Sequence, residues 1–208
     1  METKNELLGN AVELEMVINR DFWNNQYVTR NTGWDLGEIS EPLKSYIDQL
    51  LNKNIRILIP GCGNSYEADY LLNNGFTDIT VIDIAPELTQ KLQERYKGNK
   101  KIKIITGDFF EHIGQYELIL EQTFFCAINP LLRQQYAKKM NELLSQGGKL
   151  VGLFFNKEFE KQGPPFGGSK ADYIPIFNPY FTFNVFESCH NSYLKRLNTE
   201  LFFIFVKK

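Results

Sequence analysis

The chain has 208 residues, 43% of them hydrophobic, which is enough for one folded domain with a sizeable core. Its 23 basic and 25 acidic side chains give a net charge of −2, so extended binding to nucleic acid has no electrostatic support. No apolar run reaches the about 20 residues that a membrane span needs. Residues 1–16 mix acidic with apolar side chains, unlike a signal peptide, and we expect a cytoplasmic protein.

Cysteine and histidine are too few and too scattered to predict a disulfide framework or a metal site. The three cysteines, Cys62, Cys126 and Cys189, form no CxxC pair and are odd in number, so we expect reduced thiols. The two histidines, His112 and His190, do not provide a histidine-based ligand set. No resident metal is expected.

In chain order, short β-branched runs alternate with longer amphipathic segments. Asn64 is positioned to cap the first of these helices, and Gly147-Gly148 to separate the third helix from the strand after it. The expected strands are residues 55–59, 79–84, 102–106, 117–121 and 149–155, and the expected helices are residues 65–73, 86–96 and about 131–144.

The last part of the chain has a different pattern. Residues 181–186 and 200–206 are aromatic strands joined only by a loop, which predicts an antiparallel hairpin at a sheet edge. Strand–helix alternation predicts a parallel sheet covered by helices on both faces. We therefore expect one α/β domain over residues 1–208, with a three-layer Rossmann-like fold and a mostly parallel seven-stranded sheet. Five alternating units followed by a hairpin are typical of class I methyltransferases.

The turn after the first strand has features of a ligand site. Gly61 and Gly63 carry no Cβ, so the backbone can approach a ligand closely, although such turns also serve chain reversal alone. Asp83 ends the second strand, twenty residues after Gly63, where a carboxylate can accept hydrogen bonds from both hydroxyls of a ribose. Its alternative role is to cap the helix that begins near Pro86.

Position 66 and the end of the third strand help to distinguish between the possible nucleotide-like ligands. A dinucleotide fingerprint would have a third glycine at position 66, but this residue is Tyr66, which disfavours a pyrophosphate and an NAD-dependent oxidoreductase. At the end of the third strand, Asp108 can accept a hydrogen bond from an adenine amino group and Phe109 can stack on its ring. Alternatively, Asp108 is a turn residue and Phe109 belongs to the core.

Five short motifs occur in an order that identifies a family: PGCG at residues 60–63, VIDI at 81–84, GDFF at 107–110, TFFCAINP at 123–130 and GPPF at 163–166. Together they resemble the thiopurine S-methyltransferase family, and most closely its halide/thiol methyltransferase branch. The resemblance extends from about residue 22 to residue 206. It implies S-adenosylmethionine as cofactor and a small molecule as methyl acceptor.

The resemblance also implies which residues contact this cofactor. Aromatic side chains near the N-terminus would fold over it, where their faces attract a sulfonium cation; without the resemblance, Trp23 and Trp34 are ordinary core residues. Glu121 matches an acidic position beside the amino-acid end of the cofactor. The implied set is Trp23, Tyr27, Trp34, Gly61, Asp83, Asp108, Phe109 and Glu121.

For the acceptor, the resemblance implies two residues. Arg133 occupies a position where the family keeps an arginine near the substrate pocket, and we expect it to act in catalysis and acceptor binding unless it is a solvated surface charge. Phe166 lies in a loop that resembles the pocket wall, where the halide/thiol branch often has tyrosine. Losing that hydroxyl disfavours halide and favours a larger or softer thiol.

The expected reaction is in-line methyl transfer to sulfur by a monomeric enzyme. Two alternatives remain open from the sequence. The acceptor could be another small nucleophile, such as halide, tellurite, a selenium compound, or an oxygen or nitrogen group. The chain could also bind S-adenosylmethionine without turnover.

Overall fold

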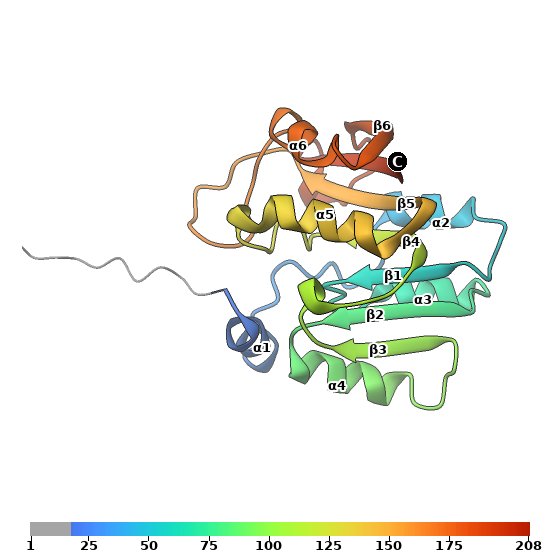
Figure 1. Ribbon diagram of the computed structural model, residues 1–208. Helices are drawn as coiled ribbons and strands as arrows, with labels where there is room; N and C mark the ends of the chain where they lie inside the picture. Colours follow the sequence, from blue (N-terminus) through green and yellow to red (C-terminus); the bar gives the residue numbers. More distant parts are fainter. Residues whose placement is uncertain (1–17) are drawn as a thin grey trace, which may run out of the picture.

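The computed structural model describes residues 18–208, so the expectation about a signal peptide concerns residues outside the described part. All seven strands form one sheet in the order β3-β2-β1-β4-β5-β7-β6, as Figure 1 shows. The first five strands run parallel, and β7 pairs antiparallel with both β5 and β6. The predicted fold and terminal hairpin are confirmed. The strands are β1 (Arg56–Pro60), β2 (Asp78–Asp83), β3 (Ile102–Thr106), β4 (Tyr116–Gln122), β5 (Leu144–Phe155), β6 (Phe181–Ser188) and β7 (Glu200–Lys207).

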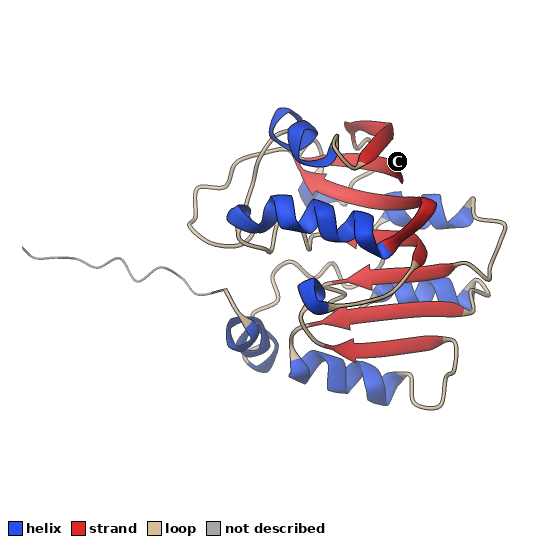
Figure 2. Cartoon of the chain, in the orientation of Figure 1, coloured by secondary structure: helices blue, strands red, loops and turns tan. Residues whose placement is uncertain are grey.

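Helices cover both faces of this sheet and make three layers (Figure 2). On one face, a single apolar cluster joins the sheet to three helices: α2 (Glu41–Asp48), α3 (Tyr66–Asn73) and α4 (Pro86–Arg95). The other cluster packs α5 (Arg133–Leu143) and α6 (Lys170–Phe177) on the opposite face. Helix α1 (Arg20–Val28) lies beyond the tips of the strands. Short 3-10 helices are η1 (Phe109–Glu111), η2 (Pro130–Leu132) and η3 (Leu194–Arg196).

Three local features differ from expectation. Asn64 does not cap α3: the N-cap is Ser65 in a left-handed conformation, and the Asn64 amide donates to Asp35 instead. Gly147 and Gly148 do not separate α5 from β5, because β5 already begins at Leu144, which pairs irregularly with β4. Helix α6 was not predicted, although a capping box between Ser169 and Asp172 begins it. Its internal proline hid the helical pattern.

The strand order determines where a ligand can bind. The order reverses between β1 and β4, and in open α/β sheets ligands bind beyond the carboxyl ends of the strands at such a reversal. In Figure 1 these ends face α1. Within residues 18–208, no helix has the length and apolar character needed to cross a bilayer. The same residues hold no group of three or more His, Cys, Asp or Glu side chains placed to bind a metal.

Candidate functional site

A cavity of about 810 Å³ lies at the carboxyl ends of the strands. Its wall comes from α1 and the following loop, the β1–α3 turn, the ends of β2 to β5, and the loop before α6. Arg196, in the connection between β6 and β7, completes the wall. Seven of the eight residues in the implied cofactor set line it together: Trp23, Tyr27, Trp34, Gly61, Asp83, Asp108 and Phe109. Glu121, Arg133 and Phe166 do not line it.

Three aromatic side chains, Trp23, Tyr27 and Trp34, form what we call the aromatic cover. Trp34 packs edge-to-face on both partners, with ring centroids 5.5 Å from Trp23 and 5.9 Å from Tyr27. The N-cap Asn19 begins α1 by accepting from the Phe22 N–H. The cover therefore presents aromatic surface to the cavity from a short helix and the loop that follows it.

Both glycines of the β1–α3 turn have left-handed backbones, with φ of +56° at Gly61 and +52° at Gly63. A Cβ on Gly61 would collide with the Phe124 ring. The glycine at position 61 is therefore required by a side chain of the protein itself. At Gly63 a Cβ would come 3.6 Å from the Tyr27 hydroxyl, so this position faces the aromatic cover.

Asp83 joins the turn to the second strand. Its Oδ2 accepts the Gly63 N–H at 3.2 Å and its Oδ1 accepts the Ala85 N–H at 3.0 Å. Because the carboxylate is only 7% exposed, burial raises the pKa of Asp83 to about 6, against the lowering effect of these hydrogen bonds. An ionised carboxylate has about four acceptor positions, so each oxygen retains room for another donor from the cavity. Asp83 does not cap α4, the alternative considered from the sequence, because the N-cap is Ala85 and no side chain caps that helix.

Asp108 and Phe109 lie at the end of β3. The Asp108 carboxylate accepts the Phe110 N–H at 2.8 Å and so caps η1. Phe109 is buried, with its ring edge-to-face on Phe110 and Phe124 at 5.4 and 5.2 Å between centroids. Each residue therefore combines its local structural role with a position in the cavity wall.

Glu121 lies inside the protein, behind the wall. It is completely buried, and its Oε1 accepts the N–H groups of Phe124 and Phe125 at 2.7 and 3.1 Å. The Tyr136 hydroxyl donates to the other oxygen. Burial raises the pKa of Glu121 to about 7, although these three hydrogen bonds lower it. The expected contact with the cofactor does not fit this position, since the carboxylate holds the turn that forms the wall and its neighbour Gln122 faces the cavity.

Arg133 is neither a surface charge nor a residue of the wall. It is 9% exposed, and its Nη2 donates to the carbonyl oxygens of Gly167 at 2.8 Å and Phe166 at 3.3 Å. Its guanidinium carbon lies 4.8 Å from the Phe125 ring centroid. The N–H of Phe166 in turn donates to the Cys126 carbonyl at 2.7 Å. Both residues fix the loop whose prolines, Pro164 and Pro165, line the cavity.

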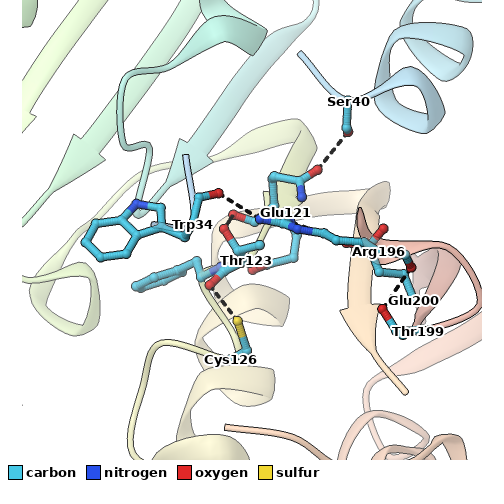
Figure 3. A network of polar contacts seen from close by, with 10 residues as sticks. Trp34, Ser40, Glu121, Thr123, Cys126, Arg196, Thr199 and Glu200 are labelled. Carbon is cyan, nitrogen blue, oxygen red and sulfur yellow. Dashed lines mark hydrogen bonds and ion pairs between the residues drawn. The ribbon is translucent and has the colours of Figure 1, made fainter. Parts of the chain in front are cut away.

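Two cationic residues line the wall, Lys161 and Arg196, and the sequence motifs indicated neither of them. Lys161 is exposed, whereas Arg196 is largely buried. The Arg196 side chain is 11% exposed and donates from Nη2 to the Trp34 carbonyl at 2.7 Å. Its Nη1 lies 3.4 Å from Oε1 of Glu200, which is also buried (Figure 3). No motif surrounds Arg196, and the only sequence signal was the basic pair Lys195-Arg196 shortly before the last strand. Only the fold brings it to the aromatic cover.

A family model described as thiopurine S-methyltransferase matches residues 18–201. A probable thiol methyltransferase 2 of Arabidopsis thaliana is 28% identical over 162 residues, which are 76% of this chain and 71% of that protein. A thiopurine S-methyltransferase of Pseudomonas fluorescens (strain SBW25) is 25% identical over 187 residues, covering 80% of this chain and 85% of that protein. A thiocyanate methyltransferase 1 of Brassica oleracea is 29% identical over 153 residues, 71% of this chain and 67% of that protein.

Among solved structures, a similar fold occurs in the 1,6-didemethyltoxoflavin-N1-methyltransferase of Burkholderia thailandensis, with bound 1,6-didemethyltoxoflavin and S-adenosylhomocysteine. The TM-score is 0.74 at 16% identity, over 91% of this chain and 87% of that one. The magnesium protoporphyrin IX methyltransferase of Synechocystis, with bound S-adenosylhomocysteine, has a TM-score of 0.68 at 15% identity, over 91% and 97%. These likenesses show the fold alone.

Proposed function

Because this chain belongs to the thiopurine S-methyltransferase family, we propose that it methylates a small thiol. Family membership makes it an S-adenosylmethionine-dependent methyltransferase, as the resemblance of its motifs implied. The acceptor is the part that we propose. The names of the relatives, thiol, thiocyanate and thiopurine methyltransferases, all describe sulfur-containing acceptors.

The residues of the cavity fit the cofactor. A volume of about 810 Å³ lies within the range of ordinary cofactor pockets. Ser65 lines it with a hydroxyl that is buried and has no hydrogen-bond partner among the described residues, so a polar ligand group would satisfy it. We propose that Asp83 accepts from the ribose hydroxyls, that Asp108 and Phe109 hold the adenine, and that the aromatic cover faces the sulfonium.

When bound, S-adenosylmethionine supplies an activated methyl group. The task left to this chain is to align an acceptor with that methyl, and such positioning contributes up to roughly 7–11 kcal/mol. Phe124, Cys126 and Pro164 provide a mainly apolar wall that excludes water from a soft nucleophile. A thiol with a pKa of about 8.5 is already a few per cent ionised at neutral pH, so the reaction does not require a dedicated general base.

The observation that carries the proposal is the position of Arg196 in this mainly apolar wall. A guanidinium stays protonated and stabilises a nearby thiolate, which increases the reactive fraction of the acceptor. We therefore assign the cationic role expected of Arg133 to Arg196.

Competition between acceptors tests the proposal. The purified protein is given S-adenosylmethionine with equal amounts of bisulfide, an aromatic thiol, iodide and an aliphatic amine, and the methylated products are quantified. We expect the two thiols to account for most of the product, with iodide well below them. Preferential methylation of iodide or of the amine would contradict a thiol acceptor while leaving the family assignment intact.

A further inference from the structure

Arg196 makes contacts with two distant parts of the chain at once. It follows β6, yet its Nη2 donates to the main-chain carbonyl of Trp34, 162 residues earlier, at 2.7 Å. Its Nη1 is fixed by Glu200 at 3.4 Å, and its guanidinium carbon lies 5.5 Å from the Phe155 ring centroid. Figure 3 shows this arginine between Trp34 and Glu200. Contacts with Glu200 of β7 and Phe155 of β5 therefore fix the orientation of Arg196, and its hydrogen bond to Trp34 reaches the aromatic cover.

The cover is held from two sides. On the side of the glycine turn and α4, the Asn64 amide donates to the Asp35 carboxylate, and the N–H of Glu87 in α4 donates to the Asn24 side chain at 2.8 Å. On the side of β7, Arg196 holds the carbonyl of Trp34. A bond from a charged donor contributes more than a neutral one. Losing Arg196 would thus release one side of the cover while the other side stays attached.

We propose that Arg196 is a positioning residue that links acceptor binding to the placement of the aromatic cover. This inference rests on the proposed function, because the same guanidinium faces the acceptor. A guanidinium has five N–H donors, so one group can hold Trp34 and Glu200 and still interact with an anion in the cavity. Linkage is reciprocal: a cover fixed by Arg196 favours acceptor binding, and a bound acceptor favours the fixed cover.

The matched variants are Glu200→Gln and the double variant Arg196→Met with Glu200→Gln. Glu200 is only 3% exposed, so removing Arg196 alone would leave a buried carboxylate without its cation and would endanger folding. Glu200→Gln keeps the arginine and its bond to Trp34. The two variants therefore differ only in the group that is being tested.

Hydrogen exchange of the ligand-free proteins measures the placement of the cover. In the double variant we expect amides of residues 19–36 to exchange roughly tenfold faster than in Glu200→Gln, the effect of losing one charge-assisted hydrogen bond. Amides of β5 report global stability and should be unchanged. Acrylamide quenching gives a second readout, because both tryptophans of the chain, Trp23 and Trp34, belong to the cover.

Equal exchange of residues 19–36 in the two variants, or an equal acceleration in the cover and in β5, would overturn the inference. With bisulfide as acceptor, the double variant should also show a raised KM compared with Glu200→Gln, and Arg196→Lys in the same background should restore part of it. If no acceptor is methylated, the proposed function fails, but exchange in the ligand-free protein still decides whether Arg196 holds the cover.

Discussion

At the level of single residues, Asp83 contributes both to the fold and to the site. Its carboxylate accepts the N–H groups of Gly63 and Ala85, which fixes the turn after β1 relative to the start of α4. The same carboxylate lines the cavity. Removing it would therefore loosen the turn as well as remove the proposed ribose contact.

Replacing Asp83 with alanine should weaken binding of S-adenosylhomocysteine roughly tenfold or more, since bonds to a charged acceptor contribute about 1.5–3 kcal/mol. Calorimetric titration measures the dissociation constant. Asp78→Ala is the matched control, because Asp78 begins the same strand and is exposed. Unchanged affinity in the Asp83 variant would remove this residue from the cofactor site.

The same residue predicts a pH dependence. Hydroxyl donors bond more strongly to the ionised carboxylate than to the protonated acid, and burial raises the pKa of Asp83 to about 6. Affinity in the wild-type protein should therefore be full above that pH and fall as the pH drops through about 6. In the Asp83→Ala variant this fall should be absent. The same slope in both proteins would mean that another group controls binding.

Glu121 and Arg133 show what sequence patterns cannot decide about a charged residue. The resemblance associated both with ligands because they match family positions, and both lie next to cavity-lining residues in the chain. In the structure each faces inward, Glu121 toward the N–H groups of Phe124 and Phe125, and Arg133 toward carbonyls of the loop before α6. A one-residue difference along a strand reverses the direction of the side chain, and Gln122 faces the cavity instead.

At the level of elements, the β1–α3 turn is the part most restricted by its shape. Gly61 has a left-handed backbone and lies against the Phe124 ring. Gly75, after α3, is also left-handed, with φ of +86°, but a Cβ there would meet nothing within 4 Å. Comparing an alanine at each of the two positions therefore separates the cost of backbone strain from the cost of the collision with the Phe124 ring.

Gly61→Ala should therefore reduce the free energy of unfolding by about 2 kcal/mol more than Gly75→Ala does, because overpacking is added to backbone strain. Urea denaturation of both variants measures the difference. Equal losses would show that the Phe124 ring moves aside without cost, and would remove the close packing of this ring from our account of the turn.

Elements with regular patterns were predictable, and those determined by pairing or capping were not. The β-branched runs of β1, β2 and β3 indicated the strands to within one residue at either end. The early start of β5 depends on an irregular pairing of Leu144 with Tyr116, which no local pattern records. Helix α6 depends on its capping box, since Pro175 disrupts its helical signal.

At the level of the whole molecule, the cavity is a product of topology. Its wall combines segments from residue 18 to residue 196, which the reversal of strand order brings to one edge of the sheet. Motifs near the parallel strands were predictable because each follows a strand directly. The position of Arg196 was not predictable, since this residue reaches the cavity only because β7 pairs antiparallel with β5.

Calorimetric titration of S-adenosylmethionine into the purified protein, followed in the same cell by bisulfide, is the most direct test of a cofactor-dependent thiol methyltransferase. We expect saturable binding at one site per chain, followed by heat of turnover with methanethiol as product. Binding without turnover would contradict bisulfide as acceptor. Absence of binding would contradict the assignment of the cavity to the cofactor.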